Sequence, residues 1–497
     1  MVQTRGGVLL VLALVLPVAA MLVALPLGGR AARRIALAVL PVGLLLAIAI
    51  TVMVQQTGEP LVYLVGGWAP PLGIALRADG ISAAMLLTAA LVLGAVGLYA
   101  RISYPEPRDG TEARAPFAFW LLLLALWGAL VGAFVGGDLF NLFVALEMLA
   151  FAALALACLD GRPTQFKAEL RYLLYALLGS VLYLLGSALF YGNYGTLDVV
   201  LLSRLTRADL PTIAAAALMT GGLLAKTALL PLHLWLPPAH SGAPPAASAL
   251  LSAVVVKAAF FLLLRLWFGA LAGVAFVKGA QALALLGAGA ILIGSVLALA
   301  QQRLKLLVAY STVAQIGYLF LMFPLVSASP LAGAWTGGIL QAISHALAKA
   351  AMFLAAGLLA DAAGNDRIDG LAGMARGAPR TVLAFALGGM TLMGLPPSGG
   401  FSAKWLLLQA AIATGQWWWA LVVLLGGLLT GSYVYRVLRS ALREAPGPQA
   451  GAALLPAGQQ NAALSLAVLS MLIGLLPLGS FGLLQVGRLD IALAGLR

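Results

Sequence analysis

Long apolar runs recur along almost the whole chain, with short polar connections between them. A helix needs about 20 mostly apolar residues to cross a bilayer. By this measure the sequence contains fourteen spans, at 8–28, 34–54, 79–100, 116–135, 138–158, 170–191, 211–236, 246–269, 280–300, 306–326, 334–360, 380–411, 416–437 and 461–484. Only 9% of the residues are charged, and no stretch is long enough for a soluble domain. We therefore predict an all-α polytopic membrane protein with about 14 transmembrane helices.

Lys and Arg residues are distributed unequally between the two sides that fourteen spans define. Cations near the end of a span are counted with the adjoining connection. The connections after the odd-numbered spans then carry 17 of the 29, the other side, which includes both termini, carries 8, and four lie deep inside spans. Because cytoplasmic loops carry an excess of Lys and Arg, we expect both termini to lie outside. The net charge of +13 is then a topology signal and does not indicate a nucleic-acid partner.

Two of the spans contain sequences that interrupt a helix. The seventh runs into Pro231, and the twelfth contains Pro396 and Pro397. Proline lacks a backbone N–H and clashes with the preceding turn, so both helices should be broken. A pair of broken helices in corresponding places of two halves indicates a transport site. The spacing predicts five-helix repeats of helices 4–8 and 9–13, and hence four segments: 1–115 with three helices, 116–270 and 271–440 with one repeat each, and 441–497 with a loop and the final helix.

Five ionisable side chains lie deep inside the apolar runs. They are a glutamate in the fifth span and one lysine in each of spans seven, eight, eleven and twelve, namely Glu147, Lys226, Lys257, Lys349 and Lys404. On the insertion scale each charge costs about 2.5 to 3.5 kcal/mol at the bilayer centre. One of them alone could snorkel or form a static ion pair. Five together favour a function, and an excess of buried lysines, some of them neutral part of the time, suits a proton relay.

The chain contains three histidines, and one of them is paired with a buried lysine. His345 precedes Lys349 by four residues, which puts both on one helix face. Imidazole transfers protons near neutral pH, although hydrogen-bonded packing is the alternative for a membrane histidine. His233 and His240 follow the first helix break, and we expect structural or proton-uptake roles for them rather than haem ligation.

The tenth span is unusually polar on part of its surface. It contains Tyr310, Ser311 and Gln315. These side chains could hold water along a half-channel, or could bridge helices as Ser and Thr often do in membranes.

No cofactor or metal is expected in this chain. A single cysteine, Cys158, and three histidines exclude a disulfide framework, a thiolate-bound iron–sulfur cluster and a four-ligand Cys/His zinc site. No phosphate or dinucleotide fingerprint opens a helix. A redox cofactor would therefore have to sit on a partner.

Five motifs together carry a family resemblance: Gly137–Phe143 leading to Glu147, Ala225–Pro237, Ala243–Lys257, Ala309–Tyr318 and His345–Phe353. In this order and spacing they resemble the antiporter-like membrane subunits of respiratory complex I, Mrp cation/proton antiporters and membrane-bound hydrogenases, over roughly residues 116–440. The Gly-Asp-Leu-Phe-Asn-Leu-Phe sequence of the first motif most resembles that of the Mrp D subunit.

The resemblance implies that the two repeats are inverted, that protons move along a hydrated axis at the bilayer midplane, and that this chain has no catalytic residues and performs no chemistry on a substrate. It assigns to that axis Glu147, Lys226, Lys257, His345, Lys349 and Lys404. It also implies that the chain lies in the inner membrane of a bacterium, among other membrane subunits of one complex and in contact with lipid. If Na⁺ is carried, we expect it in a partner subunit, because hard cations prefer several oxygen ligands.

We therefore predict a proton-translocating antiporter-like subunit of the Mrp D type, and three alternatives stay open. A proton-pumping subunit of a complex I-like NADH:quinone oxidoreductase or a membrane-bound hydrogenase shares every motif. A transporter of small organic solutes predicts two sets of six helices, and the count of fourteen spans argues against it. A structural scaffold predicts that neutral replacements of the buried lysines leave function intact.

Overall fold

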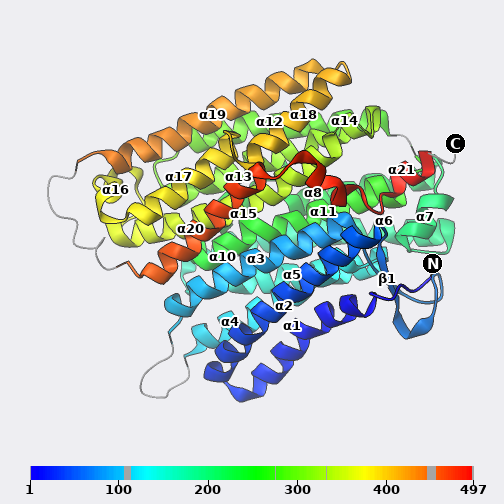
Figure 1. Cartoon of the computed structure of the whole chain (residues 1–497), viewed down its shortest axis with the longest axis horizontal. Coiled ribbons are helices and arrows are strands. Elements are labelled where there is room, and N and C mark those ends of the chain that lie inside the picture. Colours follow the sequence, from blue (N-terminus) through cyan, green and yellow to red (C-terminus); the bar gives the residue numbers. More distant parts are fainter. Residues whose placement is uncertain (1, 106–112, 275, 332, 445–454, 495–497) are drawn as a thin grey trace.

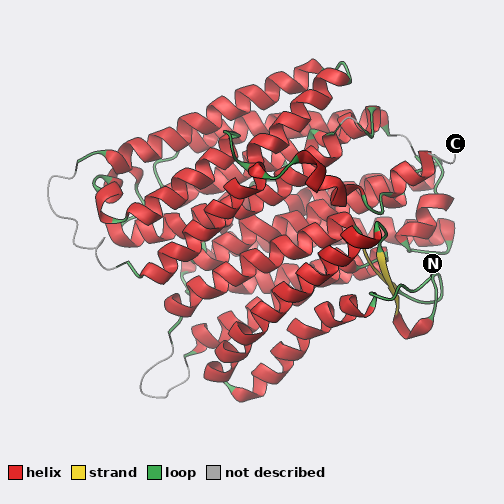
Figure 2. Cartoon of the chain, viewed as in Figure 1, coloured by secondary structure: helices red, strands yellow, loops and turns green. Residues whose placement is uncertain are grey.

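The computed structural model describes residues 2–105, 113–274, 276–331, 333–444 and 455–494, which form a bundle of long helices (Figure 1). Helices dominate, and the strands are confined to one short hairpin (Figure 2). Within the described residues, 13 helices are long and apolar enough to cross a membrane. Both termini lie at the hairpin end of the bundle (Figure 1). The predicted helical membrane architecture is confirmed.

The N-terminal segment and the first predicted repeat contain these elements: α1 (Val8–Leu27), α2 (Gly29–Thr57), β1 (Leu61–Leu64), β2 (Ala75–Ala78), α3 (Gly80–Ser103), α4 (Arg114–Val135), α5 (Leu139–Ala157), α6 (Pro163–Tyr194), α7 (Val199–Leu205), α8 (Leu210–Thr227), α9 (Leu236–Gly242), α10 (Pro245–Leu250) and α11 (Val256–Arg265). Two π-helical segments, η2 (Leu251–Val255) and η3 (Leu266–Ala270), flank α11.

The second predicted repeat and the C-terminal segment contain these elements: α12 (Val277–Ala300), α13 (Leu304–Phe320), α14 (Met322–Ala328), α15 (Ala334–Ala363), α16 (Met374–Gly377), α17 (Pro379–Met393), α18 (Gly399–Ala413), α19 (Trp417–Leu442), α20 (Ala457–Leu472) and α21 (Leu489–Ala494). Part of the connection before α20, residues 445–454, lies outside the described residues. The inverted relation of the two repeats stays a prediction.

Both predicted helix breaks are present. Helix α8 ends at Thr227, where Ala228 adopts the left-handed region with a φ of 55°, and helical structure resumes at α9. Helix α17 ends just before Gly394, which has a φ of 83°, and Ser398 caps the start of α18. Because α17 and α18 have 15 residues each, neither reaches the roughly 20 residues of a full span. The twelfth predicted span is therefore two half-helices.

Three features differ from the sequence-based expectation. Strands β1 and β2 form an antiparallel hairpin in which Leu61 pairs with Ala78. Helix α6 begins at Pro163, seven residues before the predicted span, because proline is well suited to the first helical turn. The final long α-helix ends at Leu472, and the chain continues in short 3₁₀ segments up to Gln485, on either side of Pro477.

Candidate functional site

Glu147 and Lys226 meet at the first helix break. The Lys226 Nζ lies 2.8 Å from the Glu147 Oε1, and the Ser180 hydroxyl of α6 donates a short hydrogen bond to the same oxygen. The Glu147 side chain is 20% exposed and that of Lys226 is 7% exposed. Lys226 lies in the last turn of α8, where the carbonyl ends of the helix favour a cation. The packing of α5, α6 and α8 thus brings together two residues that lie 79 positions apart in the sequence.

Two glycines allow α6 and α8 to approach closely beside this pair. A Cβ on Gly222 would clash with the carbonyl oxygen of Gly179, and one on Gly179 would lie 3.1 Å from the Lys226 Cγ. Small residues at such positions let membrane helices pack backbone to backbone. The glycine contact therefore holds Lys226 within reach of Glu147.

Gly222→Ala is expected to destabilise the chain by about 1 to 3 kcal/mol, because its methyl group meets rigid backbone. The thermal midpoint of the purified protein in detergent would measure this. The neighbouring Gly221→Ala is the matched control, since a Cβ there meets nothing within 4 Å. Equal midpoints for the two variants would contradict the close contact between α6 and α8.

Lys257 lies at the centre of the bundle. Its side chain is fully buried, and its Nζ donates a short hydrogen bond to the carbonyl oxygen of Ser252 in the π-helical segment η2. The Ser252 hydroxyl is 2.9 Å from that of Thr312 on α13. π-Helical turns inside α-helices occur frequently at functional sites. The widened turn here supplies the lysine with a backbone acceptor.

Lys349 and His345 lie on one face of α15, as predicted. The Lys349 Nζ donates to the carbonyl oxygen of Val308 at 2.9 Å and, by a short bond, to the hydroxyl of Ser311, both on α13. His345 is 1% exposed, and neither ring nitrogen has a hydrogen-bond partner among the described residues. An unpaired buried imidazole is unfavourable, because its donor and acceptor remain unsatisfied. His345 therefore retains hydrogen-bonding capacity in the interior of the bundle.

Lys404 satisfies the backbone at the second helix break. Its Nζ lies 2.5 Å from the carbonyl oxygen of Leu392 and 3.3 Å from that of Met393, at the end of α17. It also lies 4.1 Å from the centre of the Tyr318 ring, a cation–π geometry. The break therefore exposes helix-end carbonyls that accept from a cation, as the partial negative charge of a helix C-terminus favours.

Two amide side chains link α15 to this second break. Gln341, one turn before His345, donates to the Oε1 of Gln315 at 2.9 Å. Gln315 in turn donates to the Leu392 carbonyl oxygen at 3.1 Å, the same oxygen that accepts from Lys404. Polar groups thus extend from Lys349 to Lys404 with few interruptions.

The remaining predicted residues are placed differently. His240 on α9 is fully buried between the Trp235 and Phe353 rings, with both ring centroids 6.0 Å away. His233 lies in the non-helical stretch after Pro231 and is 8% exposed. Tyr310 is half-buried and packs against the apolar core. Of the tenth-span residues, Ser311 and Gln315 therefore join the lysines and Tyr310 does not.

The sequence reasoning missed several polar residues of this interior. Ser180 and Gln341 carry no charge, so nothing in the hydropathy pattern marked them. Lys305 was counted as a loop cation, yet it is 8% exposed and its Nζ lies 2.5 Å from the carbonyl oxygen of Ala243 at the end of α9. Its position on the second residue of α13 was the available signal, because a lysine there can turn inward.

Comparison with known proteins places this arrangement in a family. The model of the family described as "NADH:quinone oxidoreductase/Mrp antiporter, TM" matches residues 136–430, which include every charged residue of the interior axis from Glu147 to Lys404. The chain belongs to this family. The resemblance inferred from the five motifs is therefore confirmed.

Family members of two kinds are similar to the chain. It is 36% identical over 430 residues to the NADH-quinone oxidoreductase subunit N of Desulforudis audaxviator, covering 85% of this chain and 83% of that protein. It is 29% identical over 380 residues to the D subunit of the Na(+)/H(+) antiporter of Bacillus subtilis, covering 75% and 74%. A chain of the Mrp complex from Dietzia sp. DQ12-45-1b superposes with a TM-score of 0.85 at 26% identity, covering 99% of this chain and 97% of that one. The protein is thus an antiporter-like, multi-pass membrane subunit.

Proposed function

We propose that this chain carries protons along Glu147, Lys226, Lys257, His345, Lys349 and Lys404, as a D-like subunit of a multi-subunit Mrp-type cation/proton antiporter. The single observation that carries the proposal is the contact of Lys226 with Glu147 beside a helix break. That carboxylate stabilises the charged form of one lysine and leaves the next lysines without such help.

The partners of the three deeper lysines support a role in proton transfer. Lys257, Lys349 and Lys404 donate to carbonyl and hydroxyl oxygens. Neutral acceptors solvate an ammonium group less well than a carboxylate does, which makes loss of the proton easier. Because the acceptors are neutral, that loss also leaves no unpaired negative charge behind. A change in the Glu147–Lys226 pair then shifts the proton affinity of Lys257 electrostatically, with coupling of about 1 to 3 kcal/mol as the usual scale.

The surroundings of the chain follow from the same proposal. We infer a place in the bacterial inner membrane with both termini outside, because Lys and Arg are concentrated on the opposite side. Protons are the cargo of this subunit. Na⁺, where it is exchanged, passes through a partner subunit, since the interior axis is rich in lysine.

A proton-pumping subunit of a complex I-like NADH:quinone oxidoreductase is the second candidate. The identity of 36% to the oxidoreductase relative against 29% to the antiporter relative favours it. The motif before Glu147 favours the Mrp D type. Co-purifying subunits separate the two, because only the oxidoreductase brings redox cofactors on its partners.

Glu147→Gln and Lys226→Ala are each expected to lower proton flux by about 100-fold, the scale of a lost proton-transfer group. Flux would be measured in vesicles that carry the complete complex at matched expression. Glu59→Gln and Lys278→Ala are controls that change an exposed carboxylate and an exposed lysine. If both test variants assemble and keep their flux, the charges are structural and the proposal fails.

A further inference from the structure

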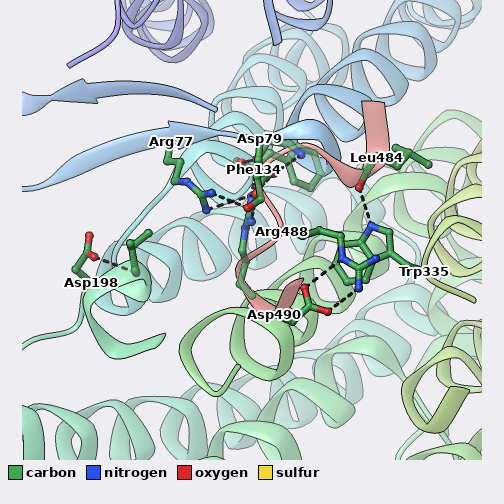
Figure 3. A network of polar contacts seen from close by, with 12 residues as sticks. Arg77, Asp79, Phe134, Asp198, Trp335, Leu484, Arg488 and Asp490 are labelled. Atoms are coloured by element: carbon green, nitrogen blue, oxygen red, sulfur yellow. Dashed lines mark hydrogen bonds and ion pairs between the residues drawn. The ribbon is translucent and has the colours of Figure 1, made fainter. Parts of the chain in front are cut away.

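A second cluster of charges lies at the hairpin end of the bundle, apart from the lysine axis. Asp79, which caps α3, pairs with Arg265 at the end of α11 through two hydrogen bonds, one of them 2.8 Å long. Arg77 lies 3.5 Å from the same carboxylate and also donates to the Gly487 carbonyl oxygen at 2.7 Å (Figure 3). The cluster therefore ties the hairpin, α11 and the C-terminal segment together.

Asp198 lies beside this cluster with half of its carboxylate unused. Its Oδ1 caps α7 by accepting from the backbone N–H groups of Val200 and Leu201 at 3.0 and 2.9 Å. Asp198 is only 3% exposed, yet its Oδ2 has no hydrogen-bond partner among the residues that the structure describes. The cap explains one oxygen and leaves the other without a structural role.

A small cavity connects Asp198 with the two arginines. It measures about 10 Å³ and is lined by Asp198, Arg77, Arg265 and the backbone of Gly136 and Gly137. This is close to the smallest volume that holds one water molecule, and the lining offers the polar partners that a water needs. A second cavity of about 10 Å³ lies on the Asp79 side of Arg265. Arg265 thus stands between two water-sized spaces.

The two buried carboxylates of this end differ in their affinity for protons. Burial raises the pKa of Asp198, against the opposing effects of its cap hydrogen bonds and Arg77, and Asp138 adds to the rise. For Asp79, burial also favours the neutral acid, but the ion pair with Arg265 outweighs it and holds the pKa below its ordinary value. Groups whose environments separate their pKa values in this way take different roles in proton transfer.

We propose that Asp198 is a proton-release site of the chain at the hairpin end, where its free Oδ2 exchanges a proton with the aqueous phase on that side through the water-sized cavity beside Arg77 and Arg265. The inference rests on the proposed function, which supplies the protons. Arg265 cannot relay the proton, because a guanidinium does not deprotonate in proteins. Asp198 binds the proton at its free Oδ2 without losing the cap.

Asp198→Asn tests the role of the acid separately from that of the cap. Asparagine caps helices as well as aspartate does, so α7 is retained while the proton-binding oxygen is lost. We expect proton flux in vesicles with the complete complex to fall about tenfold or more. Asp209→Asn is the matched control, because Asp209 caps α8 and is only partly buried. Asp198→Glu keeps a carboxylate at this position, so its flux is expected to lie between that of Asp198→Asn and that of the wild type. Flux in Asp198→Asn within about twofold of wild type overturns the inference.

The pH dependence supplies a second and independent measurement. The charged groups that face Asp198 are Arg77 on β2, Arg265 on α11 and Asp138 at the start of α5. Removing the cation in Arg77→Gln raises the proton affinity of Asp198, so the dependence of flux on the pH of the hairpin side should move to higher pH. An unmoved profile overturns the release site even where Asp198→Asn fails to assemble. Two outcomes separate the proposals. If Asp198→Asn keeps normal flux while Glu147→Gln and Lys226→Ala lose it, the release site alone is rejected. If all three variants keep normal flux, the proposed function is rejected.

Discussion

Lys257→Arg and Lys257→Met are both expected to reduce proton flux about 100-fold, although the arginine keeps the positive charge. An arginine side chain binds its proton permanently, whereas a buried lysine can release it. Flux in vesicles that carry the complete complex is the measurement. The prediction separates a lysine that changes its protonation state from one that only contributes a fixed charge to the bundle.

The control for this experiment is Lys278→Arg, which changes an exposed lysine on α12 and should leave flux unchanged. Lys257 is fully buried, so the larger guanidinium risks overpacking. The nearly isosteric Lys257→Met therefore accompanies it. Flux close to wild type in an assembled Lys257→Arg complex would show that residue 257 never gives up its proton, and the proposed pathway would have to bypass it.

Arg265→Ala is expected to destabilise the chain by about 3 kcal/mol, because it removes the main partner of the buried Asp79 and leaves only the longer contact with Arg77. The Asp79 side chain is 3% exposed and that of Arg265 is 9% exposed. The double variant Asp79→Ala/Arg265→Ala should be more stable than Arg265→Ala, since the buried carboxylate is removed together with its main partner and Arg77 keeps the Gly487 carbonyl oxygen as an acceptor. The thermal midpoint and the yield of intact complex would measure both.

The exposed ion pair between Arg376 and Glu444 gives the matched control. Its side chains are 84% and 81% exposed, so Arg376→Ala should change stability by no more than about 1 kcal/mol. Equal losses for Arg265→Ala and Arg376→Ala would mean that the buried cluster contributes no more than a surface pair. In that case the cluster would not hold the C-terminal segment against α11.

The order of spans and their interruptions were predictable because each depends on local sequence. Twenty-residue apolar runs have no alternative to helices in a bilayer, since every backbone polar group must be satisfied within the segment. Pro231 and the Pro396–Pro397 pair break their helices wherever they pack. The family motifs added the pairing of Glu147 with Lys226, which the structure places in contact.

Other elements escaped prediction because their position depends on distant partners. The hairpin of β1 and β2 is short, and its two strands also bond to backbone elsewhere in the chain, such as Gly136 beside Leu76. Arg265 and Lys305 were assigned to loops because they lie at the ends of apolar runs. The structure turns both inward, one toward Asp79 and the other toward the end of α9. Asp198 carries no sequence signal, because it lies in the connection between two apolar runs.

The sequence by itself determined that the chain is a membrane bundle, where its helices break and that the five charges deep inside its apolar runs must be buried, because hydropathy and proline act within a few residues. Only the tertiary structure decided which oxygen each buried cation meets. Lys257 finds the Ser252 carbonyl, Lys404 finds the end of α17, and Asp198 keeps one oxygen free. Hydrogen-bond partners depend on packing between helices far apart in sequence, and proton affinity depends in turn on those partners.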